Sequence, residues 1–194
     1  MQMKRLAIFA SGTGSNAKRL IDYFSEKKDI LVALLISNRK EAGALEIGRK
    51  SDIPAINFTK EEFYNSSTVI DKLIAEKIDF IVLAGFLIKV PDNILKAYEN
   101  KIINIHPALL PDFGGKGMYG LNVHKAVIES GKSESGITIH LVNELYDEGR
   151  IIFQAKCPVL ENDTAEMLAA RVQELEHNYF PEAVERFIKE KTEG

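Results

Sequence analysis

The chain has 194 residues, of which 45% are hydrophobic and 27% charged, and its 25 Lys and Arg against 28 Asp and Glu give a formal net charge of −3. A chain of this length buries about 70% of the surface that its unfolded form exposes, so the core needs neither a metal nor a disulfide. The near balance of charge argues against a large nucleic-acid interface but leaves a small anionic substrate open. We expect one domain over residues 1–194 and small-molecule partners.

Cysteine content and hydropathy point to the same class of protein. Cys157 is the one cysteine, which excludes an intrachain disulfide and a thiolate zinc site and suits a reducing compartment. No apolar run approaches the ~20 residues that span a bilayer. The segment Met1–Arg5 leads into strand-like sequence rather than a signal peptide. We expect a cytoplasmic protein, a monomer or weak homodimer, that binds neither membrane nor nucleic acid.

Short apolar runs alternate with longer amphipathic stretches through the first two thirds of the chain, which is typical of a parallel sheet covered by helices. The predicted strands are Leu6–Ala10, Ile30–Ile36, Ala55–Phe58, Phe80–Ala84 and Ile102–Ile105. The predicted helices are Ser15–Phe24, Ala44–Ser51, Thr68–Glu76, Ile94–Tyr98 and Val123–Ser130. This order predicts an α/β fold with a Rossmann-like, doubly wound, mostly parallel sheet.

The pattern changes after about residue 133. Gly136–Val142 and Ile151–Val159 are strand-like runs separated by a short polar segment, which predicts an antiparallel pair. A long final helix follows, beginning near Asp163 or Thr164, and Pro181 is expected to kink or divide it. A ligand is expected beyond the carboxyl ends of the parallel strands, where open α/β sheets have their crevices.

A glycine-containing loop, Ser11-Gly12-Thr13-Gly14-Ser15-Asn16, connects the first predicted strand to the first predicted helix. Glycines here let backbone amides approach a phosphate at the positive end of the helix. The loop lacks the second glycine and lysine of a Walker motif, so ATP hydrolysis is disfavoured. Gly12, Gly14 and Ala17 have the G-x-G-x-x-A spacing of dinucleotide-binding loops. Arg39, after the second strand, leaves NADP binding as an alternative. The simpler alternative is a tight turn that only begins a helix.

Two polar side chains end the fifth predicted strand. Asn104 and His106 are two residues apart, so in an extended strand they point to the same face. An amide can donate to a developing oxyanion, and an imidazole can donate or accept a proton near neutral pH. The pair therefore indicates acyl-type transfer, although either residue alone is more typical of a structural hydrogen bond.

Asp147, between the two late strands, is the best candidate to set the protonation state of His106. An adjacent carboxylate favours the imidazolium, so we expect Asp147 to raise the pKa of His106. An acidic loop of this kind is usually solvated, and only the presence of Asn104 and His106 favours a catalytic role. A serine nucleophile elbow, a cysteine–histidine arrangement and a paired-histidine metal motif are all missing from the sequence, which disfavours covalent and metal-dependent mechanisms.

Taken together, the glycine-containing loop, the Asn104–His106 segment and the loop with Asp147 resemble those of the phosphoribosylglycinamide formyltransferases, a group within the folate-dependent formyltransferase family. The resemblance covers nearly the whole chain and is most specific in Asn104-Ile105-His106-Pro107 followed by Leu109-Leu110-Pro111. Gly136-Ile137-Thr138-Ile139-His140, Asp147-Glu148-Gly149 and Arg171-Val172-Gln173 follow in the order of that family. The resemblance implies formyl transfer from 10-formyltetrahydrofolate to the amine of glycinamide ribonucleotide, a step in purine synthesis that uses no metal or ATP.

The resemblance also implies roles for individual positions. The catalytic set is Asn104, His106 and Asp147. The substrate phosphate is expected at Gly14, Ser15 and Asn16, and its ribose and glycinamide at Gln173 and Glu176. The folate pocket is expected at Leu87, Ile88, Lys89, Val90, Asn104, Asn143, Glu144, Leu145, Tyr146 and Asp147.

Departures from the family pattern concern the edges of this site. Many relatives have an arginine just after the Gly85-Phe86 pair and another near Asn65 or Ser66, and here both are missing, so the contacts to the folate tail are not implied. The loop Gly114–Gly120 is longer than in common members, and we expect it to affect access rather than chemistry. His140 is expected either to support the catalytic residues or to make a structural hydrogen bond.

The main alternatives change the acceptor or the class of protein. A formyltetrahydrofolate deformylase uses water but normally has an additional amino-terminal regulatory domain, for which we expect no room before Leu6. A methionyl-tRNA formyltransferase needs a further carboxyl-terminal domain, and we expect the chain to end too early for one. A non-catalytic nucleotide-binding module would leave Asn104, His106 and Asp147 without a shared purpose, and an NADP-dependent oxidoreductase would use Gly12, Gly14 and Arg39.

Overall fold

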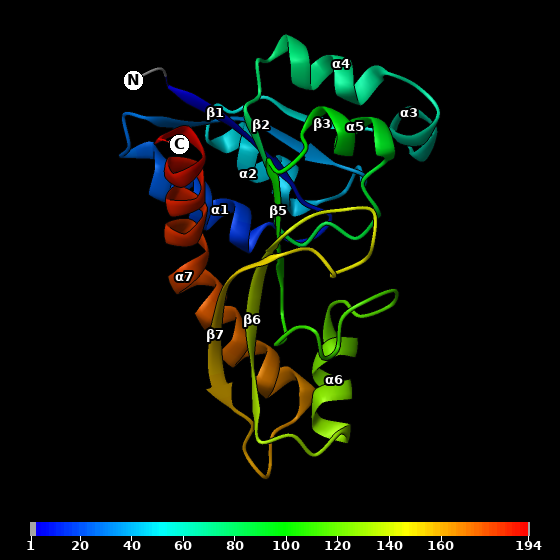
Figure 1. The fold of residues 1–194 in the computed structure, drawn as a ribbon, viewed down its shortest axis with the longest axis vertical. Helices are drawn as coiled ribbons and strands as arrows, with labels where there is room; N and C mark the ends of the chain where they lie inside the picture. The colour runs from blue at the N-terminus through cyan, green and yellow to red at the C-terminus, as the bar shows by residue number, and fades with distance from the viewer. Residues whose placement is uncertain (1–2, 194) are drawn as a thin grey trace. The chain divides into compact units, whose positions relative to one another are not determined.

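Residues 3–193 are described by the structure, a computed structural model (Figure 1). Packing divides the chain into a first unit, Met1–Ile103, and a second unit, Asn104–Gly194. The boundary falls inside strand β5 (Ile102–His106), so that the two hydrophobic residues that begin the strand belong to the first unit and Asn104 and His106 to the second. The expected single domain over residues 1–194 stays a prediction.

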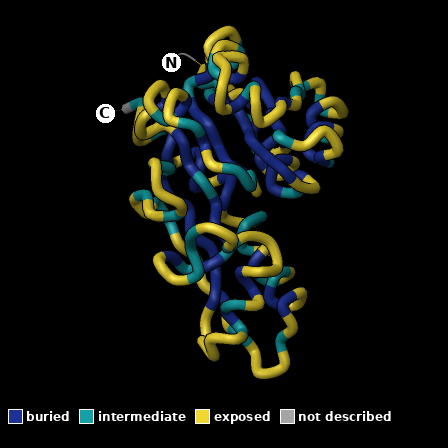
Figure 2. Tube along the Cα trace, turned by 90° about the vertical axis from the view of Figure 1, so that its right-hand side faces the viewer, coloured by how far each residue is buried: buried dark blue, intermediate teal, exposed yellow. Residues whose placement is uncertain are grey.

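The first unit contains a parallel sheet. Its strands are β1 (Lys4–Phe9), β2 (Ile30–Ser37), β3 (Ala55–Asn57) and β4 (Phe80–Leu83), in the order β3-β2-β1-β4 followed by β5. Residues 6–9 of β1 and 34–36 of β2 are fully buried, which is why these stretches are continuously apolar rather than alternating. Figure 2 shows this buried interior under exposed loops. All the predicted strands of this unit are confirmed to within two residues at each end.

Helices α1 (Ser15–Ser25), α2 (Gly43–Lys50), α4 (Thr68–Ala75) and α5 (Asp92–Ala97) follow these strands much as the apolar spacing predicts. The short helix α3 (Lys60–Tyr64) was not predicted. It begins with a capping box, in which Thr59 Oγ1 accepts from the Glu62 N–H at 3.2 Å and Glu62 Oε2 accepts from the Thr59 N–H at 2.7 Å. The Thr-x-x-Glu spacing is the sequence signal for this start.

Four phenylalanines form an aromatic cluster in the first unit. The Phe58 and Phe63 rings stack with centroids 4.4 Å apart, and Phe86 meets Phe9 edge-on at 5.2 Å. Phe63 is 1% exposed at the centre of the cluster. Because Phe86 immediately precedes Leu87, the cluster anchors the start of the segment that the resemblance assigns to folate.

The second unit is built around an antiparallel pair, as predicted. Strand β6 (Glu134–Leu141) pairs with β7 (Ile151–Pro158), and β6 also neighbours the end of β5. Helix α7 (Ala165–Glu193) packs against β6, β7 and α6 (Leu121–Glu129). Within the second unit the α/β class with a late antiparallel pair is therefore confirmed.

Helix α7 continues through Pro181 as one helix, so the expected division at this proline is wrong. A proline inside a helix removes one main-chain hydrogen bond. Phe180 and Val184, on either side of it, are fully buried and hold both halves against the core, which offsets that loss. Thr164 caps the start, accepting from the Met167 N–H at 3.3 Å, which agrees with the predicted boundary.

Within residues 3–193, no helix has the length and apolar character needed to span a membrane.

Replacing Phe63 tests whether the aromatic cluster stabilises the first unit. Phe63→Ala removes a ring that is 1% exposed, and we expect the free energy of unfolding to fall by about 3–5 kcal/mol in urea denaturation. The control Ile74→Ala removes a side chain of a residue that is 62% exposed and should change it by less than about 0.5 kcal/mol. Equal effects of the two substitutions would show that the cluster is not a core.

Candidate active site

The three predicted catalytic side chains meet in the second unit. Asn104 Nδ2 lies 3.4 Å from Asp147 Oδ1, and His106 Nδ1 lies 3.5 Å from Asp147 Oδ2. Both β5 residues therefore point to one face of the strand, as the two-residue spacing predicts. Asp147 Oδ1 faces the Asn104 amide and Oδ2 faces the His106 imidazole, so an amide, an imidazole and a carboxylate lie together.

His140, on β6, joins the same cluster. Its Nε2 lies 3.1 Å from Asn104 Nδ2 and 3.5 Å from Asp147 Oδ1. Its Nδ1 donates to the Leu141 carbonyl at 2.8 Å, because a carbonyl oxygen can only accept. In the neutral ring Nε2 is then the acceptor for the Asn104 amide. His140 thus contacts two of the three predicted catalytic residues, which favours the supporting role over a purely local structural bond.

The protonation state of His106 differs from the prediction. The imidazole is 3% exposed, and this burial lowers its pKa below the ordinary value of 6.5. The Asp147 charge and the hydrogen bond to the Phe113 carbonyl act in the opposite direction but do not outweigh burial, and His140 adds to the lowering. The expectation of a raised pKa is therefore wrong, although Asp147 does favour the imidazolium as expected.

The tautomer of His106 follows from its second hydrogen bond. Nε2 lies 2.8 Å from the Phe113 carbonyl oxygen, so Nε2 carries a proton. In the neutral ring, Nδ1 is then the unprotonated nitrogen, and it faces Asp147. A neutral His106 can therefore accept a proton at Nδ1, and the imidazolium that results has a carboxylate beside it.

Asp147 stays ionised despite being largely buried. Burial raises its pKa, but the His140 and His106 imidazoles, when protonated, and the Gly115 N–H together lower it below the ordinary value of 3.8. The Gly115 N–H donates to Oδ2 at 2.9 Å. Asp147 has a φ of 57°, in the left-handed region that residues other than glycine rarely adopt. Strain of this kind is held by the surrounding packing and is typical of functional sites.

The backbone on both sides of the cluster is fixed by close contacts. Thr138 Oγ1 donates to the Ala108 carbonyl at 2.7 Å and accepts from the Leu110 N–H at 2.9 Å, which ties the loop after His106 to β6. Gly149 lies so near the Leu141 carbonyl oxygen that an added Cβ would be 1.7 Å from it. Only glycine fits there, so the loop that carries Asp147 is closed tightly over the end of β6.

A cavity opens beside the Asp147 carboxylate. Its volume is about 460 Å³, and it is lined by Leu110, Pro111, Gly114, Gly115, Tyr146, Asp147, Glu148, Gly149 and Ile151. Tyr146 and Asp147 belong to the predicted folate segment, while Asn143 Oδ1 accepts from the Leu145 N–H at 2.9 Å in a local turn and Glu144 is exposed. The second unit thus offers space for a ligand next to Asp147, one of the three predicted catalytic residues.

The predicted phosphate loop lies at the start of α1 in the first unit. The N-cap residue is Gly14, with a φ of 86°, and it has no side chain with which to cap the helix. No acidic residue stands in the first turn of α1, where Ser15 and Asn16 begin the helix. An added Cβ on Gly14 would lie 2.6 Å from Ala44 Cα, so glycine is required by space as well as by conformation. These features favour an anion at this helix end.

The segment Leu87–Val90 also lies in the first unit. The Leu87 N–H donates to Ser11 Oγ at 3.0 Å, which connects this segment to the phosphate loop. Leu87 and Ile88 are half-buried, Lys89 is exposed and Val90 is buried. Lys89 and Val90 line a wide, open cavity of about 710 Å³ together with Tyr64 and the polar residues 65–67.

The remaining predicted site residues are on α7. Gln173 is exposed and Glu176 is half-buried, one helical turn apart on the same side of the helix. Arg171, just before them, makes two hydrogen bonds to Asp163, at 2.6 and 2.9 Å, and holds the pKa of that carboxyl down at about 2. This ion pair fixes the start of α7.

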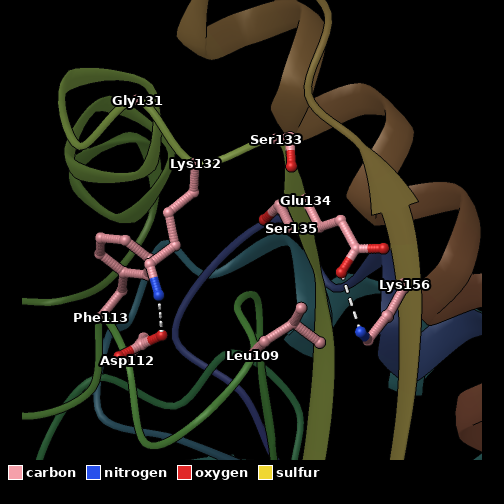
Figure 3. Close-up of a pocket in the computed structure, with 9 residues that line it drawn as sticks. All are labelled: Leu109, Asp112, Phe113, Gly131, Lys132, Ser133, Glu134, Ser135 and Lys156. Carbon is pink, nitrogen blue, oxygen red and sulfur yellow. Dashed lines mark hydrogen bonds and ion pairs between the residues drawn. The ribbon is translucent and has the colours of Figure 1, made fainter.

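A further cavity of about 450 Å³ in the second unit is lined by Leu109, Asp112, Phe113, Gly131, Lys132, Ser133, Glu134, Ser135 and Lys156 (Figure 3). Its lysines are neutralised by their neighbours. Lys132 pairs with Asp112, and Lys156 pairs with Glu134 at 2.8 Å. This internal pairing leaves little net charge to attract a substrate.

Two groups that sequence reasoning missed belong to the main chain. The Phe113 carbonyl and the Gly115 N–H hold His106 and Asp147, yet the loop Gly114–Gly120, which contains Gly115, was expected to affect access rather than chemistry. The Gly114-Gly115 pair marks a close backbone approach, but a sequence does not show which backbone atoms will be approached. Among residues 3–193, no cluster of three or more His, Cys, Asp or Glu side chains has the arrangement of a metal site.

Comparison with known proteins places this geometry in a family. The family model described as "Formyl transferase" matches residues 4–184. The chain is 45% identical to the chloroplastic phosphoribosylglycinamide formyltransferase of Vigna unguiculata and 44% identical to that of Arabidopsis thaliana, covering 98% and 97% of this chain. The chain spans 63% and 66% of those two relatives. It is 34% identical to phosphoribosylglycinamide formyltransferase of Bacillus subtilis (strain 168), covering 96% of this chain and 95% of that one.

Solved structures agree with this assignment. The crystal structure of phosphoribosylglycinamide formyltransferase from Bacillus halodurans matches with a TM-score of 0.86 and 36% identity, over 95% of each chain. The structure of that enzyme from Anaplasma phagocytophilum matches with a TM-score of 0.86 and 35% identity, over 94% of this chain and 86% of that one. The chain therefore belongs to the formyl transferase family.

Proposed function

We propose that this protein transfers the formyl group of 10-formyltetrahydrofolate to the amine of glycinamide ribonucleotide, in purine biosynthesis. The observation that carries the proposal is the convergence of Asn104 and His106 on the Asp147 carboxylate, beside a cavity of about 460 Å³. The names of the relatives, phosphoribosylglycinamide formyltransferases of a plant and of Bacillus subtilis, support the same acceptor. They favour neither the deformylase nor the NADP-dependent alternative.

The reaction begins when the amine attacks the formyl carbon and the carbonyl oxygen becomes an oxyanion. The Asn104 amide has two N–H groups, one directed to His140 Nε2 at 3.1 Å and one to Asp147 Oδ1 at 3.4 Å. The longer bond is the weaker one, and it is the one that the oxyanion replaces. An amide N–H positioned in this way stabilises the tetrahedral intermediate without a covalent bond to the protein.

The same attack releases a proton from the amine. His106, with its lowered pKa, is mainly neutral at pH 7 and accepts that proton at Nδ1. Asp147, at 3.5 Å, stabilises the imidazolium. The protonated Nδ1 then donates to the folate nitrogen as the carbon–nitrogen bond breaks, so the proton that leaves one amine arrives on the other.

The substrate-binding residues follow the family resemblance. Gly14, Ser15 and Asn16 bind the phosphate at the start of α1, and Gln173 and Glu176 bind the ribose and glycinamide. The residues 87–90 and 143–147 contact the folate, which serves as co-substrate in a reaction without metal. A cytoplasmic location and a monomeric or weakly dimeric state remain part of this proposal, as does the single domain.

Competition between acceptors tests the function itself. The purified protein is mixed with 10-formyltetrahydrofolate and offered glycinamide ribonucleotide, water alone or initiator tRNA, and the formylated product is identified by mass spectrometry. We expect formylglycinamide ribonucleotide to form and the other two acceptors to remain unused. Release of free formate at an equal rate without the ribonucleotide would assign a deformylase instead, and tight NADPH binding would favour the oxidoreductase.

Removing the Asn104 amide tests its role toward the oxyanion. We expect Asn104→Ala to lower kcat by roughly 10²–10³-fold while the KM for glycinamide ribonucleotide changes little, because the donor acts in the transition state. Asn162→Ala is the matched control, since Asn162 is exposed in a turn outside the site. Unchanged kcat in Asn104→Ala would remove the amide from the mechanism.

The proton path predicts how His106 titrates. NMR of the imidazole should place its pKa below 6.5, because burial disfavours the charged ring. Asp147→Asn removes the charge that raises this pKa, so we expect a further decrease. Glu134→Gln, which removes an exposed carboxylate paired with Lys156, should leave the His106 titration unchanged. A His106 pKa that is the same with and without the Asp147 charge would contradict the proposed coupling.

A further inference from the structure

We propose that Gly114 is a positioning residue for the reaction: because it has no side chain, the Phe113–Gly115 backbone lies against Asp147 and orients both His106 and Asp147. The inference rests on the proposed function for its kinetic consequences, but the placement itself is a property of the free protein. It gives the Gly114–Gly120 loop a role in the chemistry that the sequence did not suggest.

Two main-chain groups on either side of Gly114 make the contacts. The Phe113 carbonyl accepts from His106 Nε2 at 2.8 Å, and the Gly115 N–H donates to Asp147 Oδ2 at 2.9 Å. The first bond places the proton of the neutral imidazole on Nε2, which leaves Nδ1 facing the carboxylate. The second gives Asp147 Oδ2 a donor that no side chain has to supply. One short segment therefore sets the tautomer of the base and the direction of the carboxylate.

The space at Gly114 explains why these contacts are possible. An added Cβ would lie 2.7 Å from Leu110 Cδ2 and 3.2 Å from Asp147 Cβ. Leu110 is buried at 6% exposure, and its N–H and carbonyl are both held, by Thr138 and Gln154. Asp147 Cβ is attached to a backbone with a φ of 57°, where there is little freedom to turn. A methyl group at position 114 therefore requires Leu110 Cδ2 to move and Asp147 to shift by a few tenths of an ångström relative to the Phe113–Gly115 backbone.

The geometry of the neighbouring residues makes the test specific. Phe113 and Asp147 both have left-handed backbones, with φ of 55° and 57°, so the two facing segments are strained where they meet. Gly115 and Gly117 also have positive φ, whereas Gly114 has not. An alanine at position 114 therefore meets no conformational penalty of its own, and its effect reports the contact with Asp147 and Leu110.

The expected consequences differ from those of a general loss of stability. Moving Phe113–Gly115 away from Asp147 removes the Gly115 N–H, and this donor is one of the groups that lower the Asp147 pKa. The Asp147 pKa therefore rises. His106 also loses the Phe113 carbonyl, which favours its charged form, so the His106 pKa falls.

The test compares Gly114→Ala with Gly117→Ala in the full chain. We expect Gly114→Ala to lower kcat by about 10–10²-fold with little change in the KM for glycinamide ribonucleotide, because the reacting groups are misplaced rather than the substrate unbound. The NMR titration of His106 should move to lower pH, and the ¹³C NMR titration of the Asp147 carboxyl carbon should move to higher pH. Gly117 has open space around it and a φ of 91°, so Gly117→Ala introduces backbone strain in the same loop without a contact to Asp147. It should change neither titration.

A second pair of variants guards against a failure to fold. Leu110→Ala/Gly114→Ala relieves the 2.7 Å contact and keeps the 3.2 Å contact with Asp147, and Leu110→Ala alone is its reference. We expect the double variant to show the same shifts relative to that reference. The inference would be overturned if the His106 pKa in Gly114→Ala and in Leu110→Ala/Gly114→Ala equalled that of their reference proteins. It would also be overturned if Gly117→Ala shifted the His106 pKa as much as Gly114→Ala does. If the wild-type protein showed no formyl transfer, the proposed function would be overturned instead. The NMR titrations would still show whether Gly114 positions the Phe113–Gly115 backbone against Asp147.

Discussion

A largely buried carboxylate is the constraint on which the site depends. Removing an ionised group from water is costly unless its oxygens receive hydrogen bonds or opposite charge. Asp147 meets this requirement in the second unit with the Asn104 amide of β5 and the Gly115 N–H of the loop after β5. One of these donors, the Asn104 amide, is also the group that the proposed formyl transfer uses to stabilise its oxyanion.

The scaffold supplies this arrangement through backbone contacts rather than through many polar side chains. Thr138 ties the loop after His106 to β6, and Gly149 lets the Asp147 loop close over the Leu141 carbonyl. The first contact needs the hydroxyl of Thr138, and the second needs the missing side chain of Gly149. Neither residue type is needed to form the strand or the turn itself. A site held in this way keeps its geometry without a ligand, which reduces the reorganisation that must occur during reaction.

The sequence predicted the strands well because buried parallel strands are apolar on both faces, and it placed Asn104 and His106 on one face because strand geometry has a period of two. It missed α3, although the Thr59–Glu62 spacing carried the signal. It predicted a kink or a division at Pro181 because local propensity does not include the packing of Phe180 and Val184. The pKa of His106 was assigned in the wrong direction since a sequence shows a nearby carboxylate but not the depth of burial. The Phe113 carbonyl and Gly115 N–H were beyond prediction, because main-chain groups are identical at every residue.

The ionisation of Asp147 in the free protein tests this account most directly. A titration of its carboxyl carbon by ¹³C NMR, followed downward from pH 7 while the amide spectrum remains that of the folded protein, measures it without substrate. We expect the carboxyl to be less than half protonated at pH 3.8, because the groups around it lower its pKa below that value. A carboxyl that is already mostly protonated at this pH would show that burial dominates and that Asp147 does not organise the site.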